Sequence, residues 1–193
     1  ARQQLRSLVG RDTSSLDADL LASATVESVA ENTSDSFVAP WLFFSFLGLP
    51  GAIAYRAINT LDSMIGYRQR YEYLGKAAAR LDDLANLIPA RLAAVFIVLA
   101  ARLRGRGASR AWLTMWRDHR LTESPNAGWT MSAMAGALGV ELQKVGHYRL
   151  GDPLHPIGPP KVREAVDLAR WVAALSLLLT LGLLVARYGI LAA

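Results

Sequence analysis

The stretch WVAALSLLLTLGLLVA, residues 171–186, decides the fold class because it holds no charged residue. Trp171 opens it, and Arg187 and Tyr188 follow its last residue. A membrane-spanning helix needs ~20 mostly apolar residues, and aromatic and basic residues are enriched where such a helix leaves the lipid. We therefore expect this segment to be a membrane helix.

Basic residues set the expected orientation of this helix. Lys161, Arg163 and Arg170 precede it. Short loops that are rich in Lys and Arg tend to stay on the cytoplasmic side of a membrane. The helix is therefore predicted to start in the cytoplasm and to end outside.

Two further apolar segments lie in the middle of the chain. Residues 37–55 carry no charge, and residues 87–103 are apolar apart from two arginines near the ends. The first segment is interrupted by Pro40, Gly48, Pro50 and Gly51. Broken helices are tolerated in lipid only where protein or a wet cavity satisfies the freed backbone groups. Basic stretches flank residues 87–103 on both sides, so one of the two segments is predicted to enter the membrane and return.

The composition supports a membrane protein of one unit. Hydrophobic residues make up 52% of the chain, charged residues 19%, and the mean hydropathy is +0.23. These values are too apolar for a typical soluble domain, although a soluble helical core is the alternative. We predict one all-α domain over residues 1–193, a polytopic integral membrane protein with helical segments and re-entrant or broken helices.

Four other segments are assigned from local patterns. Residues 13–32 open with a capping pattern and predict a helix. Residues 102–120 predict an Arg-rich cytoplasmic loop that runs into an amphipathic helix. Residues 127–140 hold Ala and Gly at spacings that favour tight helix contact. Residues 146–160 are rich in Gly and Pro and predict a loop.

Several classes of protein are excluded or disfavoured. The chain has no Cys, so it has no disulfide, thiolate metal site or Cys nucleophile, and its three His are scattered. The net charge is +5, but the basic residues alternate with acids or flank apolar runs, which argues against nucleic acid. The Walker A, GxGxxG, GxSxG and HExxH patterns are absent. His119, beside Asp118, is either a base or, as we favour, a solvated loop histidine.

Four polar clusters interrupt the apolar chain. They are Glu27, Glu31, Asn32 and Asp35; Asn59, Asp62 and Ser63; Arg80, Asp82, Asp83, Asn86 and Arg91; and Ser124, Pro125, Asn126 and Gly128. Ionisable residues beside membrane segments are costly, so function is the first interpretation. The alternative for any single carboxylate is that it neutralises an arginine or lies on a solvated face.

The clusters suggest a metal and an anionic ligand. Carboxylate oxygens suit Mg²⁺, which suggests phosphate ligands in turn, and Arg and Asn bind phosphate or carboxylate oxygens. We expect Glu31, Asp62 and Asp83 to lie on helix faces that converge on one magnesium site. The run GYRQRYEY, residues 66–73, is predicted either to bind an aromatic or anionic ligand or to form an interfacial aromatic belt.

Long ordered strings resemble the CobD/CbiB family between about Val9 and Gly158. These strings are VGRDT, VESVAENTSD, APWLF, PGAIAYRAINTLDSMIGYRQRYEYLGKAAARLDDLANLIPAR and SPNAGWTMSAMAGALGV. The resemblance implies a multi-pass enzyme of the bacterial cytoplasmic (inner) membrane with its site on the cytoplasmic side. It implies a ligase of cobalamin biosynthesis that joins aminopropanol or its phosphate to cobyric acid, a corrinoid, with Mg²⁺ and ATP. The family's N-terminal hydrophobic segments are missing, so we expect the C-terminal part of a longer protein.

The resemblance also guides the assignment of site residues. The catalytic carboxylates are expected to be Glu27, Glu31, Asp35, Asp62, Asp82 and Asp83. Substrate binding is assigned to Asn32, Asn59, Ser63, Tyr67, Arg70, Tyr71, Arg80, Asn86, Arg91, Ser124 and Asn126. The expected partners are the corrinoid, the amine and membrane lipid, without nucleic acid, and homo-oligomerisation is left open. The rival functions are a membrane sensor of the AmpE type and a transporter.

Overall fold

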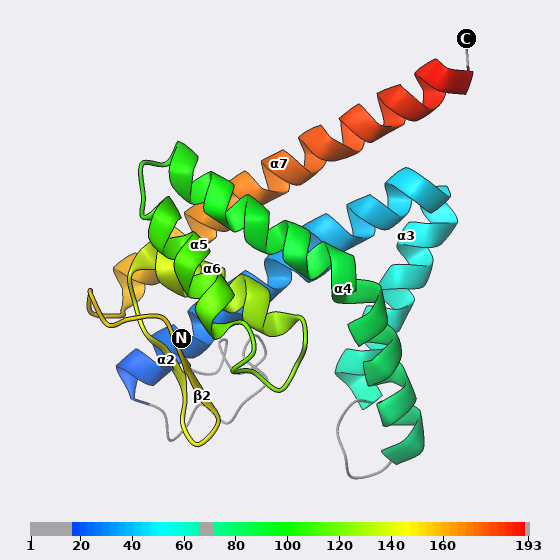
Figure 1. Ribbon diagram of the computed structural model, residues 1–193. Helices are drawn as coiled ribbons and strands as arrows, with labels where there is room; N and C mark the ends of the chain where they lie inside the picture. Colours follow the sequence, from blue (N-terminus) through cyan, green and yellow to red (C-terminus); the bar gives the residue numbers. More distant parts are fainter. Residues whose placement is uncertain (1–16, 66–71, 192–193) are drawn as a thin grey trace.

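The structure is a computed structural model that describes residues 17–65 and 72–191, and it confirms the all-α prediction (Figure 1). The elements are α2 (Ala18–Asn32), the π-helical segment η1 (Thr33–Val38), α3 (Ala39–Ile65), α4 (Glu72–Leu103), α5 (Ala108–Asp118), α6 (Ala127–Leu138), β1 (Leu142–Lys144), β2 (Tyr148–Leu150) and α7 (Pro159–Leu191). Long helices therefore dominate the described part of the chain.

Helix α2 runs into α3 through one widened turn. Asp17 caps the start of α2, because its carboxylate accepts a hydrogen bond from the Leu20 amide at 2.8 Å; residues 13–16 of the predicted helix lie outside the described residues. The π-helical segment η1 precedes Pro40, which has no amide hydrogen for the regular helical ladder. Such π-bulges often occur at functional sites.

Helix α3 is broken at Gly48, as its glycine and proline residues predict. Gly48 has φ 68° and ψ −159°, outside the helical region and accessible mainly to glycine. The two halves of α3 meet at a sharp angle at this residue (Figure 1). Arg187 of α7 donates hydrogen bonds to the carbonyl oxygens of Ser45 and Phe46, at 3.1 and 3.0 Å. These contacts satisfy backbone groups that the break leaves free.

Three helical stretches are long and apolar enough, by length and composition, to cross a membrane. They are Ala18–Met64, Tyr73–Leu103 and Pro159–Arg187. The second and third are longer than the predicted segments 87–103 and 171–186, because hydropathy marks the apolar centre of a helix and not its polar ends. Large apolar side chains on them face outward, including Leu49, which is 62% exposed, and Leu178, which is 65% exposed. By their length and composition these helices support the prediction of a membrane protein.

A packed body of α5, α6 and a β-hairpin lies beside the long helices (Figure 1). Every residue of α6 from Gly128 to Leu138 is buried. A Cβ at Gly136 would lie 2.7 Å from the Ala111 Cα of α5, so the predicted tight helix contact is confirmed. One prediction is wrong: residues 146–160 are not all loop, because β2 pairs antiparallel with β1 across the turn at Gly146, which has φ 77°.

Candidate functional site

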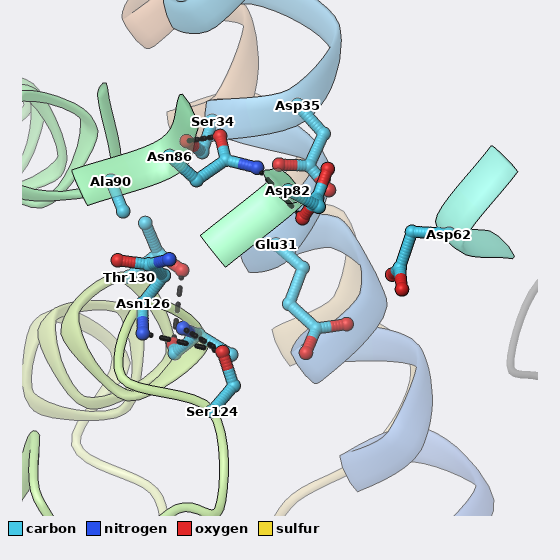
Figure 2. A pocket seen from close by; sticks show the side chains of 11 residues that line it. Glu31, Ser34, Asp35, Asp62, Asp82, Asn86, Ala90, Ser124, Asn126 and Thr130 are labelled. Atoms are coloured by element: carbon cyan, nitrogen blue, oxygen red, sulfur yellow. Dashed lines mark hydrogen bonds between the residues drawn. The ribbon is translucent and has the colours of Figure 1, made fainter. Parts of the chain in front are cut away.

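A cavity of about 260 Å³ opens where four segments of the chain meet (Figure 2). It receives residues from α2 and η1, from the second half of α3, from α4 and from the start of α6. Its lining residues are Glu31, Ser34, Asp35, Asp62, Asp82, Asn86, Ala90, Ser124, Asn126, Ala127 and Thr130. The cavity therefore draws on all four polar clusters of the sequence.

Four carboxylates give the cavity a negative charge. Asp35 and Asp82 interact electrostatically, and Asp62 interacts with Asp82 and Asp83. Figure 2 shows Asp62 approaching from a helix separate from the one that carries Asp82. Like charges at short range repel one another, and the repulsion is stronger away from bulk water. A metal cation or an ammonium group bound in the cavity would relieve this repulsion.

Amide side chains hold Asp82, which lines the cavity. Asn86, one turn further along α4, donates to one oxygen of Asp82 at 3.0 Å, and Asn59 of α3 donates to the other at 3.3 Å. Asn86 is buried, and its amide oxygen accepts hydrogen bonds from the hydroxyl groups of Tyr55 and Ser34. The position of Asp82 is thus fixed from two helices.

Tyr55 is a site residue that the sequence analysis missed. Its side chain is fully buried, and its hydroxyl lies 3.0 Å from the Asn86 amide oxygen and 3.4 Å from an Asp35 oxygen. It stacks on Phe43, with ring centroids 5.2 Å apart. Its position one turn before Asn59 could have indicated a place in the site. Tyr55 was instead assigned to the apolar run that it ends.

Asp83 lies behind the opposite wall of the cavity. Asn126 donates to the Asp83 backbone oxygen at 2.8 Å and to its carboxylate at 3.4 Å, and Ser124 donates to the same carboxylate at 3.4 Å. Arg91 donates to the Asn126 amide oxygen at 3.3 Å. Asp83 therefore orients two lining residues, although it does not line the cavity itself.

Other predicted site residues lie elsewhere. Glu27 is buried one turn before Glu31 and accepts hydrogen bonds from Ser23 at 3.1 Å and from Tyr148 at 2.9 Å. Asn32 and Ser63 bond to carbonyl oxygens of their own helical segments. Arg80 is exposed and does not line the cavity. Tyr67, Arg70 and Tyr71 lie outside the described residues.

The donor set fits magnesium in part. Within residues 17–65 and 72–191, no three His, Cys, Asp or Glu side chains are close enough together to form a metal site. Mg²⁺ is usually bound through one or two carboxylates and keeps water or phosphate ligands. The carboxylates of the cavity fit that mode better than a closed protein cage, and the magnesium site stays a prediction.

His119 differs from the solvated loop residue that we favoured from sequence. It follows α5, is half-buried, and its ring lies against Trp129 with centroids 3.9 Å apart. Its neighbour Asp118 is buried and binds Arg117 and the Gly151 amide. Burial raises the pKa of Asp118, but the hydrogen bonds and charge of these partners outweigh it, so the pKa lies below its usual value.

Comparisons with known proteins find one family. The CobD/Cbib protein family matches residues 1–176. The chain is 51% identical over 184 residues to "Cobalamin biosynthesis protein CobD" of Dehalococcoides mccartyi, covering 95% of the chain and 60% of that protein. It is 47% identical over 188 residues to the protein of the same name from Geobacter metallireducens, covering 93% of the chain and 59% of that protein.

A third relative is similar to a comparable degree. "Probable cobalamin biosynthesis protein CobD" of Methanothermobacter thermautotrophicus is 46% identical over 170 residues, which cover 88% of the chain and 57% of that protein. The chain thus spans less than two thirds of the length of these relatives. No solved structure is significantly similar to the chain.

Proposed function

The chain belongs to the CobD/CbiB family, and on this premise we propose that it is part of an enzyme of cobalamin biosynthesis. The reaction joins aminopropanol or its phosphate to a carboxylate of adenosylcobyric acid through an amide bond, with ATP as cosubstrate. The product is adenosylcobinamide or its phosphate. The observation that carries the proposal is the cavity, in which carboxylate and amide groups from four segments meet.

The chemistry requires an activated carboxylate and a neutral amine. By analogy with other ATP-dependent amide ligases, transfer of a phosphoryl group from ATP converts the corrinoid carboxylate into an acyl phosphate. The amine nitrogen then attacks the acyl carbon, phosphate leaves, and the nitrogen loses a proton. An ammonium group binds well among carboxylates, and one of them can accept the proton before the attack.

The residues of the cavity divide this work. Asp82 is fixed by two amides and is suited to hold a cationic group in one place. Glu31 and Asp62 add charge from two other helices. Ser124 and Asn126 form the wall on the side of α6 and orient the substrate. Mg²⁺, held by one or two of these carboxylates, would neutralise charge on the phosphate groups when bound.

The proposed location is the bacterial inner membrane, with the cavity open to the cytoplasm. ATP is found on that side, and the basic residues before α7 favour the same orientation. An accessibility experiment tests this: Ser124→Cys in the full-length protein should react with an impermeant thiol reagent in inverted vesicles and not in intact cells.

The direct test is formation of the amide. Full-length protein is incubated with adenosylcobyric acid, aminopropanol or its phosphate, and Mg-ATP, and the product is identified by mass spectrometry. We expect an amide whose formation stops in excess EDTA. A sensor or a transporter would show no ATP turnover that depends on the corrinoid, and that result would refute the proposal.

The cavity is tested by substitutions that keep shape and remove charge. Asp62→Asn and Asp83→Asn should each lower turnover by ~100-fold or more, about 2.7 kcal/mol in the transition state. Asp19→Asn, which removes the same charge from an exposed position at the start of α2, is the matched control and should keep normal turnover. If both site variants turned over normally while folding as well as the parent protein, the site assignment would be wrong.

A further inference from the structure

A second cavity, of about 310 Å³, adjoins the first and has the opposite character. Its lining residues are Arg91, His119, Arg120, Thr122, Ser124, Pro125 and Trp129. Ser124 lines both cavities. The first cavity is lined by four carboxylates and no cation, whereas the second is lined by two arginines and no carboxylate.

Arg91 is held in place by neutral groups. Its guanidinium donates to the Leu87 carbonyl oxygen at 2.6 Å and to the Asn126 amide oxygen at 3.3 Å. It also lies over the ring of Trp129, 5.0 Å from the ring centroid. Among the described residues no carboxylate pairs with Arg91 or Arg120. The arginines of the second cavity therefore form no ion pair within the described part of the chain.

His119 lines the second cavity and is held through its Nδ1 nitrogen. Nδ1 lies 3.2 Å from the Met115 carbonyl oxygen and 3.1 Å from that of Trp116, and both oxygens can only accept. Nδ1 must therefore carry a hydrogen, which leaves Nε2 for other partners. Trp129, itself 8% exposed, contacts the His119 ring at a tilt and the Arg91 guanidinium by a cation–π contact.

We infer that this second cavity, which Arg91, His119, Arg120 and Trp129 define, binds the phosphate group of a substrate. Arginine is well suited to phosphate oxygens because its donors form a planar fork, and a fixed guanidinium loses little entropy on binding. The inference rests on the proposed function for the identity of the ligand. Phosphate binding can be measured without the corrinoid and without turnover. The phosphate-binding inference and the proposed function can therefore fail separately.

The shared wall gives the inference a functional consequence. A phosphate in the second cavity lies across Ser124 and Asn126 from the carboxylates of the first. Anionic and cationic parts of the substrates are thereby kept apart, and the carboxylates do not face the phosphate charge directly. Arg91 and Arg120 thus supply one charge environment, and the carboxylates between residues 31 and 82 supply the other.

The test uses pyrophosphate as the probe and isothermal titration calorimetry as the measurement. The full-length protein is reconstituted in nanodiscs of phosphatidylcholine. We expect saturable binding that Arg120→Gln weakens by ~10-fold or more, about 1.4 kcal/mol, and that Arg91→Lys also weakens because lysine lacks the planar fork. The matched control is Arg163→Gln, which removes the same charge from an exposed position on α7 and should bind as the parent does.

Three outcomes would overturn the inference. The first is unchanged affinity in both Arg120→Gln and Arg91→Lys. The second is an equal loss in Arg163→Gln, which would show a general effect of net charge. The third is loss of pyrophosphate binding when the nanodiscs contain phosphatidylglycerol, because the cavity would then take lipid headgroups. Equal affinity in the two lipids supports a soluble phosphate ligand.

Discussion

Helices α6 and α7 are both apolar, but α6 is buried within the protein, whereas α7 exposes large apolar side chains on its surface. All residues of α6 from Gly128 to Leu138 lie inside the protein, whereas Leu178 and Val185 of α7 are 65% and 72% exposed. The difference follows side-chain size. Eight of the twelve residues of α6 are Ala, Gly, Ser or Thr, whereas Leu is the commonest residue over the apolar part of α7. Small residues let another helix approach closely, and large apolar residues suit contact with lipid.

Hydropathy alone does not identify the lipid-facing helix. Gly136 of α6 lies against the backbone of α5, and Arg110 of α5 donates to the Gly136 carbonyl oxygen at 2.7 Å. Gly182 of α7 has open space where a Cβ would stand. Glycine therefore marks a close helix contact at position 136 and no such contact at position 182.

The largest expected effect comes from a charge on the exposed face of α7. Leu178→Lys should cost about 3 kcal/mol if that face meets lipid, because lysine is costly at the centre of a membrane helix. Leu113→Lys on α5 is the control: Leu113 is 68% exposed, as accessible as Leu178, but lies on the packed body. The measurement is the yield of membrane-integrated full-length protein after carbonate extraction. Equal yields from the two variants would remove the distinction between the two helices.

The second effect compares the two glycines. Gly136→Ala should lower the free energy of unfolding by ~1–3 kcal/mol, because the new Cβ would lie 2.7 Å from the Ala111 Cα and 2.8 Å from the Arg110 oxygen. Gly182→Ala should be neutral or stabilising by up to about 1 kcal/mol, since alanine favours the helix. Thermal unfolding in one detergent measures both variants. A stable Gly136→Ala protein would show that the α5–α6 contact is looser than described.

Much of the fold was predictable because apolar runs and breakers act locally. The run 171–186 predicted α7, and the glycine and proline residues of 37–55 predicted the break at Gly48. The hairpin was missed because it depends on pairing of Leu142 with Leu150, which no local pattern reports. The high content of Gly and Pro after residue 146 favoured a loop instead.

The candidate site was predictable in its residues more than in its arrangement. The sequence grouped Asp82 and Asn86 in one polar cluster, and the structure shows them bonded. Spacing does not say which helices meet, so Asp83 was expected in the cavity and lies behind its wall. The roles of Trp129 and His119 arise from contacts between α4, α5 and α6, which sequence position does not reveal.

The third effect concerns the contact that joins α7 to the broken helix. Arg187→Gln should lower the free energy of unfolding by about 1 kcal/mol, because two charge-assisted hydrogen bonds to Ser45 and Phe46 are lost from an exposed side chain. Arg187→Lys, which keeps the charge but not the fork, should retain part of the stability. Thermal unfolding in lipid nanodiscs checks both variants. Full stability of the Gln variant would mean that lipid or water satisfies those carbonyl oxygens.

The smallest expected effect is on the pH dependence of stability, which should differ between the packed body and the membrane helices. The folded-state pKa of Asp118 lies below its unfolded value, which is about 3.9 for an aspartate. Its stabilising contribution is therefore fully present above pH ~4 and is lost as pH falls through the folded pKa. Asp118→Asn should cost about 0.5–1 kcal/mol at pH 7 and should flatten the loss of stability in acid.

Hydrogen exchange shows whether the loss of Asp118 loosens the packed body alone or also α7. Asp118 accepts a hydrogen bond from the Gly151 amide at 2.8 Å, so acid or Asp118→Asn should free the segment after β2 first. Hydrogen exchange should then rise in residues 139–158 and stay unchanged in α7, which has no contact with Asp118 among its described hydrogen bonds. Asp152→Asn, which removes the exposed second partner of Arg117, is the control and should have a smaller effect. If exchange rose equally in α7, the body and the membrane helices would unfold as one unit, and the contrast between α6 and α7 would concern surroundings only and not stability.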